Sequence, residues 1–169
     1  ALPVILPELA KLLDDGVRNP LANLEQACAL SDETAVRYAA LVAGLDDETR
    51  ERLHQRLKLP NDCKTLAATG ESLRQALATD PQLDAERIRS LIDAADGWRR
   101  PERFQQVLAV LQAVGVDKAS ADLMEKAREK ASGVDPQELM KAGYKGKALG
   151  EAIQAERLER IRGQVVGGR

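Results

Sequence analysis

Histidine, cysteine and aromatic residues are scarce in this 169-residue chain, which has one His, two Cys, one Trp, one Phe and two Tyr. This scarcity rules out the common His/Cys metal sets and any mechanism that needs two histidines. Cys28 and Cys63 lack metal-binding or redox spacing, and each falls on an apolar helical stripe, so we expect two buried thiols of a cytoplasmic protein. His54 lies in a charged segment, where we expect an exposed helix residue.

Long apolar runs are also absent, and so is the pattern of a secretory signal peptide, so we expect no membrane partner. The apolar 44% of the chain is mainly Leu and Ala, with few β-branched residues. This composition favours helices over strands. The sequence therefore predicts an all-α fold, an irregular bundle of nine or ten helices.

Charge is spread unevenly along the chain. The net charge is −2, but residues 141–169 contain seven Lys or Arg and three Glu, so this end is basic and the first 140 residues are acidic. A basic end suggests an anionic partner, although a solvated helix would have the same composition.

The only Trp and the only Phe both fall in residues 91–104. Apolar residues recur at helical spacing on either side of this corner, which predicts two helices. We expect Gly97 to end the first helix with a positive φ and Pro101 to start the second. Trp98 and Phe104 are predicted to be core anchors, because large aromatic side chains bury the most area.

Further helices follow from local signals. Residues 36–43 are apolar around most of a helical circumference, which predicts the buried centre of the first half. Each of four sites precedes a helical segment as a cap: residues 31–33 (Ser-Asp-Glu), Asp46, Asp84 and Asp135.

No catalytic constellation is visible, and we expect this chain alone to be inactive. Carboxylates are spread over solvated helix faces rather than gathered on a rigid scaffold for metal chemistry. Residues 143–150, Gly-Tyr-Lys-Gly-Lys-Ala-Leu-Gly, are not a phosphate-binding P-loop, because Lys141 and Ala148 stand where Gly and Ser or Thr are required. The Gly-x-x-Gly loop of KH domains also matches poorly, because those domains need a sheet.

Glycines at a helix start nevertheless allow a phosphate to approach backbone N–H groups. Lys145 and Lys147 flank such a start, and Arg157 and Arg160 continue along the same helix. This pattern could hold the backbone of a structured RNA. A tight helix connection with solvated lysines explains it equally well.

Four stretches together resemble bacterial CCA-adding enzymes, the class II tRNA nucleotidyltransferases. Residues 1–9 are similar to the segment that follows the neck region of those enzymes. Residues 56–61, Arg-Leu-Lys-Leu-Pro-Asn, are similar to the family's Arg-Leu-x-x-Pro-Asn turn. Residues 91–103 resemble the corner Asp-x-x-Asp-x-Trp-Arg-Lys/Arg-Pro-x-Arg. Residues 139–150 resemble the tail pattern Gly-Phe/Tyr-x-Gly-x-x-Ile/Leu-Gly.

The resemblance implies the C-terminal part of an enzyme that adds CCA to tRNA 3′ ends from CTP and ATP with Mg²⁺. In that family a Gly-rich loop and an Asp-x-Asp pair in an N-terminal head perform the chemistry, and neither occurs here. This chain would then need no cofactor, and its partners would be tRNA and the head of the same polypeptide. The resemblance also implies a helical body at residues 1–115 and a tail at 116–169 that support the acceptor and TΨC arms.

The candidate RNA-binding residues are Arg99, Arg100, Lys145, Lys147, Arg157 and Arg160, and the landmarks of the resemblance are Trp98, Gly143 and Gly146.

Residues 1–60 resemble a remnant of the family's phosphohydrolase region. The family's first histidines would fall near residues 15–24 and its His-Asp pair just after Leu41, where this chain has Val-Ala-Gly. The site has been lost, or it lies in stretches absent from this sequence, so we expect no metal site here. Two alternatives remain open: a helical interaction or scaffold module, and the equivalent part of a related poly(A) polymerase.

Overall fold

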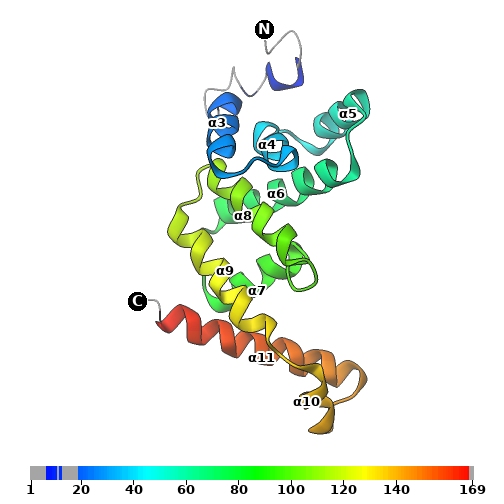
Figure 1. Ribbon diagram of the computed structural model, residues 1–169, viewed down its shortest axis with the longest axis vertical. Coiled ribbons are helices and arrows are strands. Elements are labelled where there is room, and N and C mark those ends of the chain that lie inside the picture. The colour runs from blue at the N-terminus through cyan, green and yellow to red at the C-terminus, as the bar shows by residue number, and fades with distance from the viewer. Residues whose placement is uncertain (1–6, 11, 13–18, 168–169) are drawn as a thin grey trace. The chain divides into compact units, whose positions relative to one another are not determined.

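The computed structural model describes residues 7–10, 12 and 19–167, and all regular structure in these residues is helical (Figure 1). The all-α prediction is therefore confirmed, with nine α-helices, one 3-10 helix and no strand among the described residues. Residues 1–6 lie outside them, as do residues 15–18 of the segment 15–24 in which the family's first histidines would fall. The elements are η1 (Pro7–Leu9), α3 (Pro20–Leu30), α4 (Thr34–Leu41), α5 (Asp47–Leu57), α6 (Asn61–Thr79), α7 (Ala85–Ala94), α8 (Pro101–Ala113), α9 (Lys118–Ser132), α10 (Pro136–Lys141) and α11 (Gly146–Gly167).

The chain forms two compact units. Unit 1 contains the residues up to Asp80 together with Gln105–Asp117, and unit 2 contains Pro81–Phe104 and Lys118–Arg169. Helix α8 thus begins in unit 2 and continues in unit 1. This grouping joins the aromatic corner to the C-terminal helices, whereas the body at 1–115 and the tail at 116–169 stay predictions about family domains.

Helix α4 is the buried centre of unit 1, as its sequence predicts. It packs against both α3 and α6, and Val36, Ala39 and Ala40 are at most 2% exposed. Three of the predicted caps are confirmed, but the one at residues 31–33 is not, because Glu33 at the N-cap position of α4 makes no side-chain hydrogen bond to that helix. The carboxylates of Asp46, Asp84 and Asp135 each accept a hydrogen bond of 2.8 Å from a backbone N–H of the helix that follows.

A buried carboxylate joins α6 to the turn after α4. Glu71 accepts hydrogen bonds from the backbone N–H of Gly44 at 2.9 Å, from Arg74 at 2.5 and 2.8 Å, and from Gln75 at 3.0 Å. Burial by itself raises the pKa of Glu71, but these donors together outweigh it and hold that pKa below its ordinary value. Glu71 therefore remains charged inside unit 1.

For two residues of unit 1 the predicted exposure is wrong. His54 is buried at 2% exposure rather than exposed, because α5 turns it toward Tyr38, whose ring centre is 5.6 Å away. Cys28 is exposed rather than buried, because α3 packs on α4 through its other side; Cys63 is buried as predicted. In both helices apolar side chains are too few or too dispersed to define the inner face.

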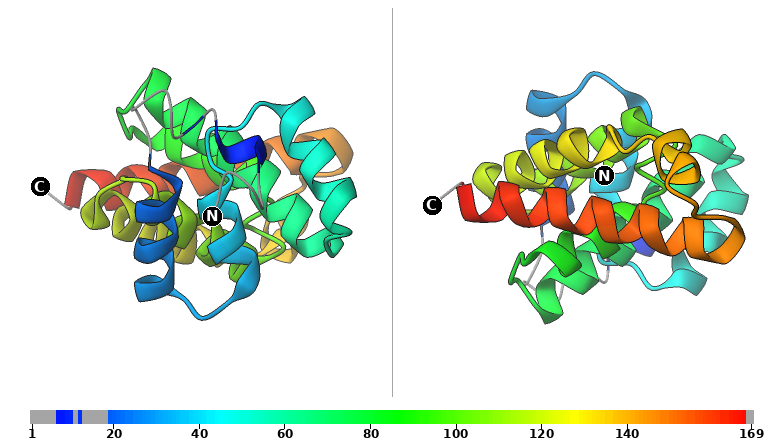
Figure 2. Two further views of the ribbon diagram at one scale, coloured as in Figure 1. Left: turned by 90° about the horizontal axis from the view of Figure 1, so that it is seen from above. Right: turned by 90° about the horizontal axis from the view of Figure 1, so that it is seen from below.

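In unit 2, α11 packs along α9 and also contacts α7 and α10 (Figures 1 and 2). Phe104 is fully buried, as predicted, but Trp98 is only half-buried and is not a core anchor. The turn also differs from prediction, because Asp96 adopts the positive φ of 53°. Gly97 is required for space instead, since a Cβ there would lie 2.9 Å from Ile92 and 3.1 Å from Phe104.

Candidate nucleic-acid interface

All six predicted RNA-binding residues lie in unit 2. Arg99 and Arg100 follow α7, and the other four lie at the start of α11 or along it. The structure brings one of them, Arg157, onto the landmark Trp98. The other five remain apart from one another at the surface. Four of them lie close to an acidic residue, and Lys145 has no ion-pair partner among the described residues.

Trp98 links the end of α7 to the middle of α11. The Arg157 guanidinium carbon lies 4.4 Å from the centre of the Trp98 ring, which is the geometry of a cation–π contact. The indole N–H donates to a carboxylate oxygen of Asp93. Burial lowers the pKa of Arg157, although the charge of Asp93 opposes that shift. The Arg157 guanidinium therefore lies in a partly dehydrated place.

Arg89 extends this link. Its Nη1 donates to the other carboxylate oxygen of Asp93 at 2.9 Å and also to Oε1 of Gln154 at 3.4 Å. Asp93 thus accepts hydrogen bonds from both Arg89 and Trp98, and each of these two residues also contacts a residue of α11. Asp93 belongs to the quoted corner pattern, but the sequence alone does not reveal its two partners.

Arg99 and Arg100 share one acidic neighbour. Their side chains are 76% and 56% exposed, and Asp96 lies 3.2 Å from the first and 4.0 Å from the second. Such exposed pairs contribute little to stability and compete weakly with other anions. Both arginines are therefore accessible to a phosphate.

The basic residues of α11 are largely paired within the helix. Lys147 lies 3.6 Å from Glu151, Arg160 lies 3.0 Å from Glu156, and Arg162 donates to Glu159. Arg160 also points one guanidinium nitrogen at the carbonyl of Lys130, 3.5 Å away. The net positive charge along α11 is thus smaller than its lysines and arginines suggest.

Residues 139–150, which comprise the end of α10, the turn and the start of α11, contain three lysines and no acidic residue. We call this segment the tip. Lys141 and Lys145 are exposed, the side chain of Lys147 is 93% exposed, and Tyr144 and Met140 are exposed at 44% and 53%. Sequence reasoning did not select Lys141 or Tyr144, because their exposure depends on how the tip folds.

Gly143 and Gly146 shape the tip. Both have positive φ, 102° and 55°, and a Cβ at either would meet no atom within 4 Å. They are therefore needed for the turn rather than to admit a closely packed neighbour. Both explanations of the lysines, an RNA contact and simple solvation, stay predictions. The open space lets an anion approach the first N–H groups of the 22-residue α11.

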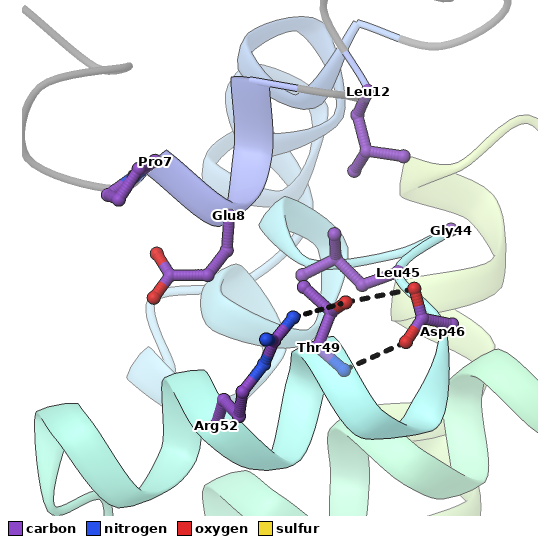
Figure 3. A pocket seen from close by; sticks show the side chains of 8 residues that line it. All are labelled: Pro7, Glu8, Leu12, Gly44, Leu45, Asp46, Thr49 and Arg52. Atoms are coloured by element: carbon purple, nitrogen blue, oxygen red, sulfur yellow. Dashed lines mark hydrogen bonds between the residues drawn. The ribbon is translucent and has the colours of Figure 1, made fainter.

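Unit 1 contains a pocket of about 380 Å³ between η1 and the start of α5 (Figure 3). Figure 3 shows Asp46 held by Thr49, which in turn is contacted by Arg52. The Glu8 carboxylate accepts two hydrogen bonds from Arg56, which lower its pKa. Each of these polar groups has a structural partner, so the pocket presents no acid, base or nucleophile in a catalytic arrangement.

Val42 and Ala43, where the family's His-Asp pair would fall, are buried at 1% and 4% exposure. Within the part of the chain that the structure describes, no three His, Cys, Asp or Glu side chains are close enough to hold a metal ion. No helix in that part is long and apolar enough to cross a bilayer.

Comparison with known proteins connects this chain to one group of enzymes. It is 39% identical to the "Multifunctional CCA protein" of Pseudomonas putida strain KT2440 over 167 residues, covering 95% of this chain and 44% of that protein. It is 34% identical to the "CCA-adding enzyme" of Marinobacter nauticus over 166 residues, covering 95% and 44%. No protein-family model and no solved structure matches.

The chain is therefore homologous to a part of the CCA-adding enzymes and spans less than half of their length. A further relative, the "Multifunctional CCA protein" of Psychromonas ingrahamii, is 29% identical over 200 aligned positions, more than the 169 residues of this chain. That relative thus has internal residues that this chain lacks.

Proposed function

We propose that this chain is the tRNA-binding, C-terminal part of a CCA-adding enzyme, and that the rest of the parent enzyme adds CCA from CTP and ATP with Mg²⁺. Homology to CCA-adding enzymes over 95% of the chain supports this proposal most strongly. The relatives reported above are all named for CCA, which favours this function over that of a poly(A) polymerase.

The tip supplies the chemistry for an RNA contact. Three exposed lysines lie in residues 139–150, which contain no acidic residue, so this segment has a net positive charge, although Glu151 lies 3.6 Å from Lys147. Tyr144 adds an exposed aromatic ring on which an unpaired base can stack. A scaffold module has no need of this combination of lysines, an open glycine turn and a solvated aromatic ring.

Arg99, Arg100 and Arg160 form the remaining part of the proposed interface. The first two are exposed on the corner, and Arg160 is half-exposed on α11. Their acidic neighbours are also solvated, so exchanging one of these carboxylates for an RNA phosphate costs little. Arg157 has a different environment, on the face of the Trp98 ring.

Titration of tRNA against the chain at several salt concentrations tests the proposal. Each phosphate contact should make log affinity fall by roughly 0.7–0.9 per unit of log salt. Replacing Lys145 and Lys147 together by Gln should weaken binding at low salt. It should also reduce the magnitude of this slope by the amount that corresponds to about two phosphate contacts. The absence of tRNA binding at low salt would favour the scaffold alternative.

A matched pair of charge reversals provides the control. Arg100→Glu changes an exposed residue of the proposed interface, and Lys126→Glu changes an exposed residue of α9 outside it. Both alter the net charge equally, so a general electrostatic effect would weaken both. We expect only Arg100→Glu to weaken tRNA binding, by about tenfold. Equal affinities of the two variants would contradict the interface.

A further inference from the structure

The first two thirds of α11 are weakly anchored by apolar burial. None of residues 146–160 is buried, although all of them are described, and Ile161 is the first fully buried side chain in the helix. The apolar side chains before it, such as Ile153 and Leu158, are half-buried. Other contacts must therefore fix the direction of this part of the helix.

Helix α11 packs along α9, and Arg160 lies beside the end of α9. Arg160 reaches the carbonyl of Lys130 in the last turn of α9, and it closely approaches Gly133, just beyond that helix. Residues 146–156 continue past the end of α9 toward α10 (Figures 1 and 2). Their remaining support comes from the short α10 and from α7.

Two side-chain contacts join α7 and the turn after it to the first part of α11. Arg157 covers the face of Trp98 at 4.4 Å, and Gln154 lies 3.4 Å from Arg89. Both contacts depend on Asp93, whose two carboxylate oxygens accept from Trp98 and Arg89. One acidic residue therefore orients both groups that hold α11.

Arg157 differs from the other cations of α11. Lys147, Arg160 and Arg162 each lie next to a Glu of the same helix, whereas Arg157 lies on an aromatic ring. Its Nε is buried and has no hydrogen-bond partner among the described residues. The Arg157 side chain is also only half-exposed, whereas the lysines of the tip are exposed.

We propose that Arg157 is a positioning residue rather than an RNA contact, and that its stacking on Trp98 sets the direction of α11 and thereby the place of the tip. This inference rests on the proposed tRNA-binding function. The distance involved is large: Gly146 precedes Arg157 by 11 residues, or about 16 Å of helix. A tilt of roughly 10° at Arg157 would move the tip by about 3 Å, well beyond the tolerance of a hydrogen bond.

The test compares Arg157→Gln with Arg157→Lys, and uses Arg162→Gln on the same helix as a control. Trp98 is the only tryptophan, so its fluorescence reports on the stacking directly. In Arg157→Gln we expect emission at longer wavelength, because the indole face becomes hydrated, and faster amide hydrogen exchange in residues 146–153. Arg157→Lys retains a cation on the ring and should restore most of both signals. Arg162→Gln should change neither.

Binding to tRNA separates positioning from direct contact. Arg157→Gln should lower tRNA affinity by about tenfold in the otherwise unaltered chain. This loss should largely disappear when Lys145 and Lys147 are already Gln, because a displaced tip then has no phosphate contacts left to lose. The proposal is overturned if Arg157→Gln weakens binding equally in both backgrounds, as the loss of a direct contact would, or if the emission or the exchange of residues 146–153 does not change.

The two proposals fail separately. If the unaltered chain does not bind tRNA, the proposed function is wrong. The positioning role is then judged by amide exchange and fluorescence alone: faster exchange with shifted emission in Arg157→Gln supports it, and unchanged values overturn it.

Discussion

Unit 1 and the α10–α11 segment of unit 2 use charged residues in opposite ways. Unit 1 buries Glu71, Arg50 and His54, at 2–7% exposure. In contrast, no residue of 136–160 is buried. The charges of unit 1 therefore hold its own helices together, whereas those of the tip remain in contact with solvent. A charge that is already used by the fold cannot also bind a partner, so function is expected where charge is left at the surface.

The largest expected effect follows from removing the buried carboxylate. Glu71→Ala leaves Arg74 without its partner and the Gly44 N–H without its acceptor, so the free energy of unfolding should fall by about 3 kcal/mol. Urea denaturation measures this. Glu156→Ala provides the comparison, because Glu156 also pairs with an arginine, at 3.0 Å, but is 44% exposed.

The Glu156 variant should lose at most about 1 kcal/mol. Equal losses of unfolding free energy in the two variants would show that a buried carboxylate stabilises the protein no more than an exposed one.

A smaller effect is expected from pH. Burial lowers the pKa of His54 below its ordinary value, although nearby Glu51 opposes the shift and Arg50 and Lys64 assist it. The unfolded chain then binds the proton more readily than the folded chain does. The free energy of unfolding should therefore fall as the pH drops below about 6.5, and the loss is complete once the pH is below the folded pKa.

Urea denaturation between about pH 7.5 and 5.5 tests this, with His54→Gln as the comparison. The variant should lose the part of the pH dependence that belongs to His54. If both proteins show the same pH dependence, His54 is not the group responsible.

The smallest effect is expected at the tip. Glu151→Gln removes a carboxylate that is 67% exposed and lies 3.6 Å from Lys147. Stability should change by less than about 0.5 kcal/mol. Affinity for tRNA should rise slightly at low salt, because Lys147 loses its competing anion, and this gain should vanish at high salt. A large loss of stability would mean that the tip depends on its ion pairs, as unit 1 does.

The sequence predicted features that depend on local signals. Helices follow from apolar spacing, and Asp46, Asp84 and Asp135 cap them because a short carboxylate before a helix reaches its first N–H groups. The burial of α4 follows from its nearly continuous apolar surface. These features need no knowledge of neighbouring helices.

Features that depend on packing between helices were predicted less well. His54 and Cys28 lie on helices whose apolar residues do not mark one face, so the neighbours decide which side is buried. The contact between Trp98 and Arg157 joins residues 59 positions apart, and no pattern in one sequence reveals such a pair. At the candidate interface, the sequence therefore indicated the basic residues but not their different environments.

The different exposure of the two cysteines has a practical consequence. Cys63 is 6% exposed and Cys28 is exposed, so a thiol-reactive dye should label the native protein in unit 1 at Cys28. The only tryptophan, Trp98, lies in unit 2. Energy transfer from Trp98 to such a dye would report the separation of the two units in solution, before and after tRNA is added, without any change to the sequence.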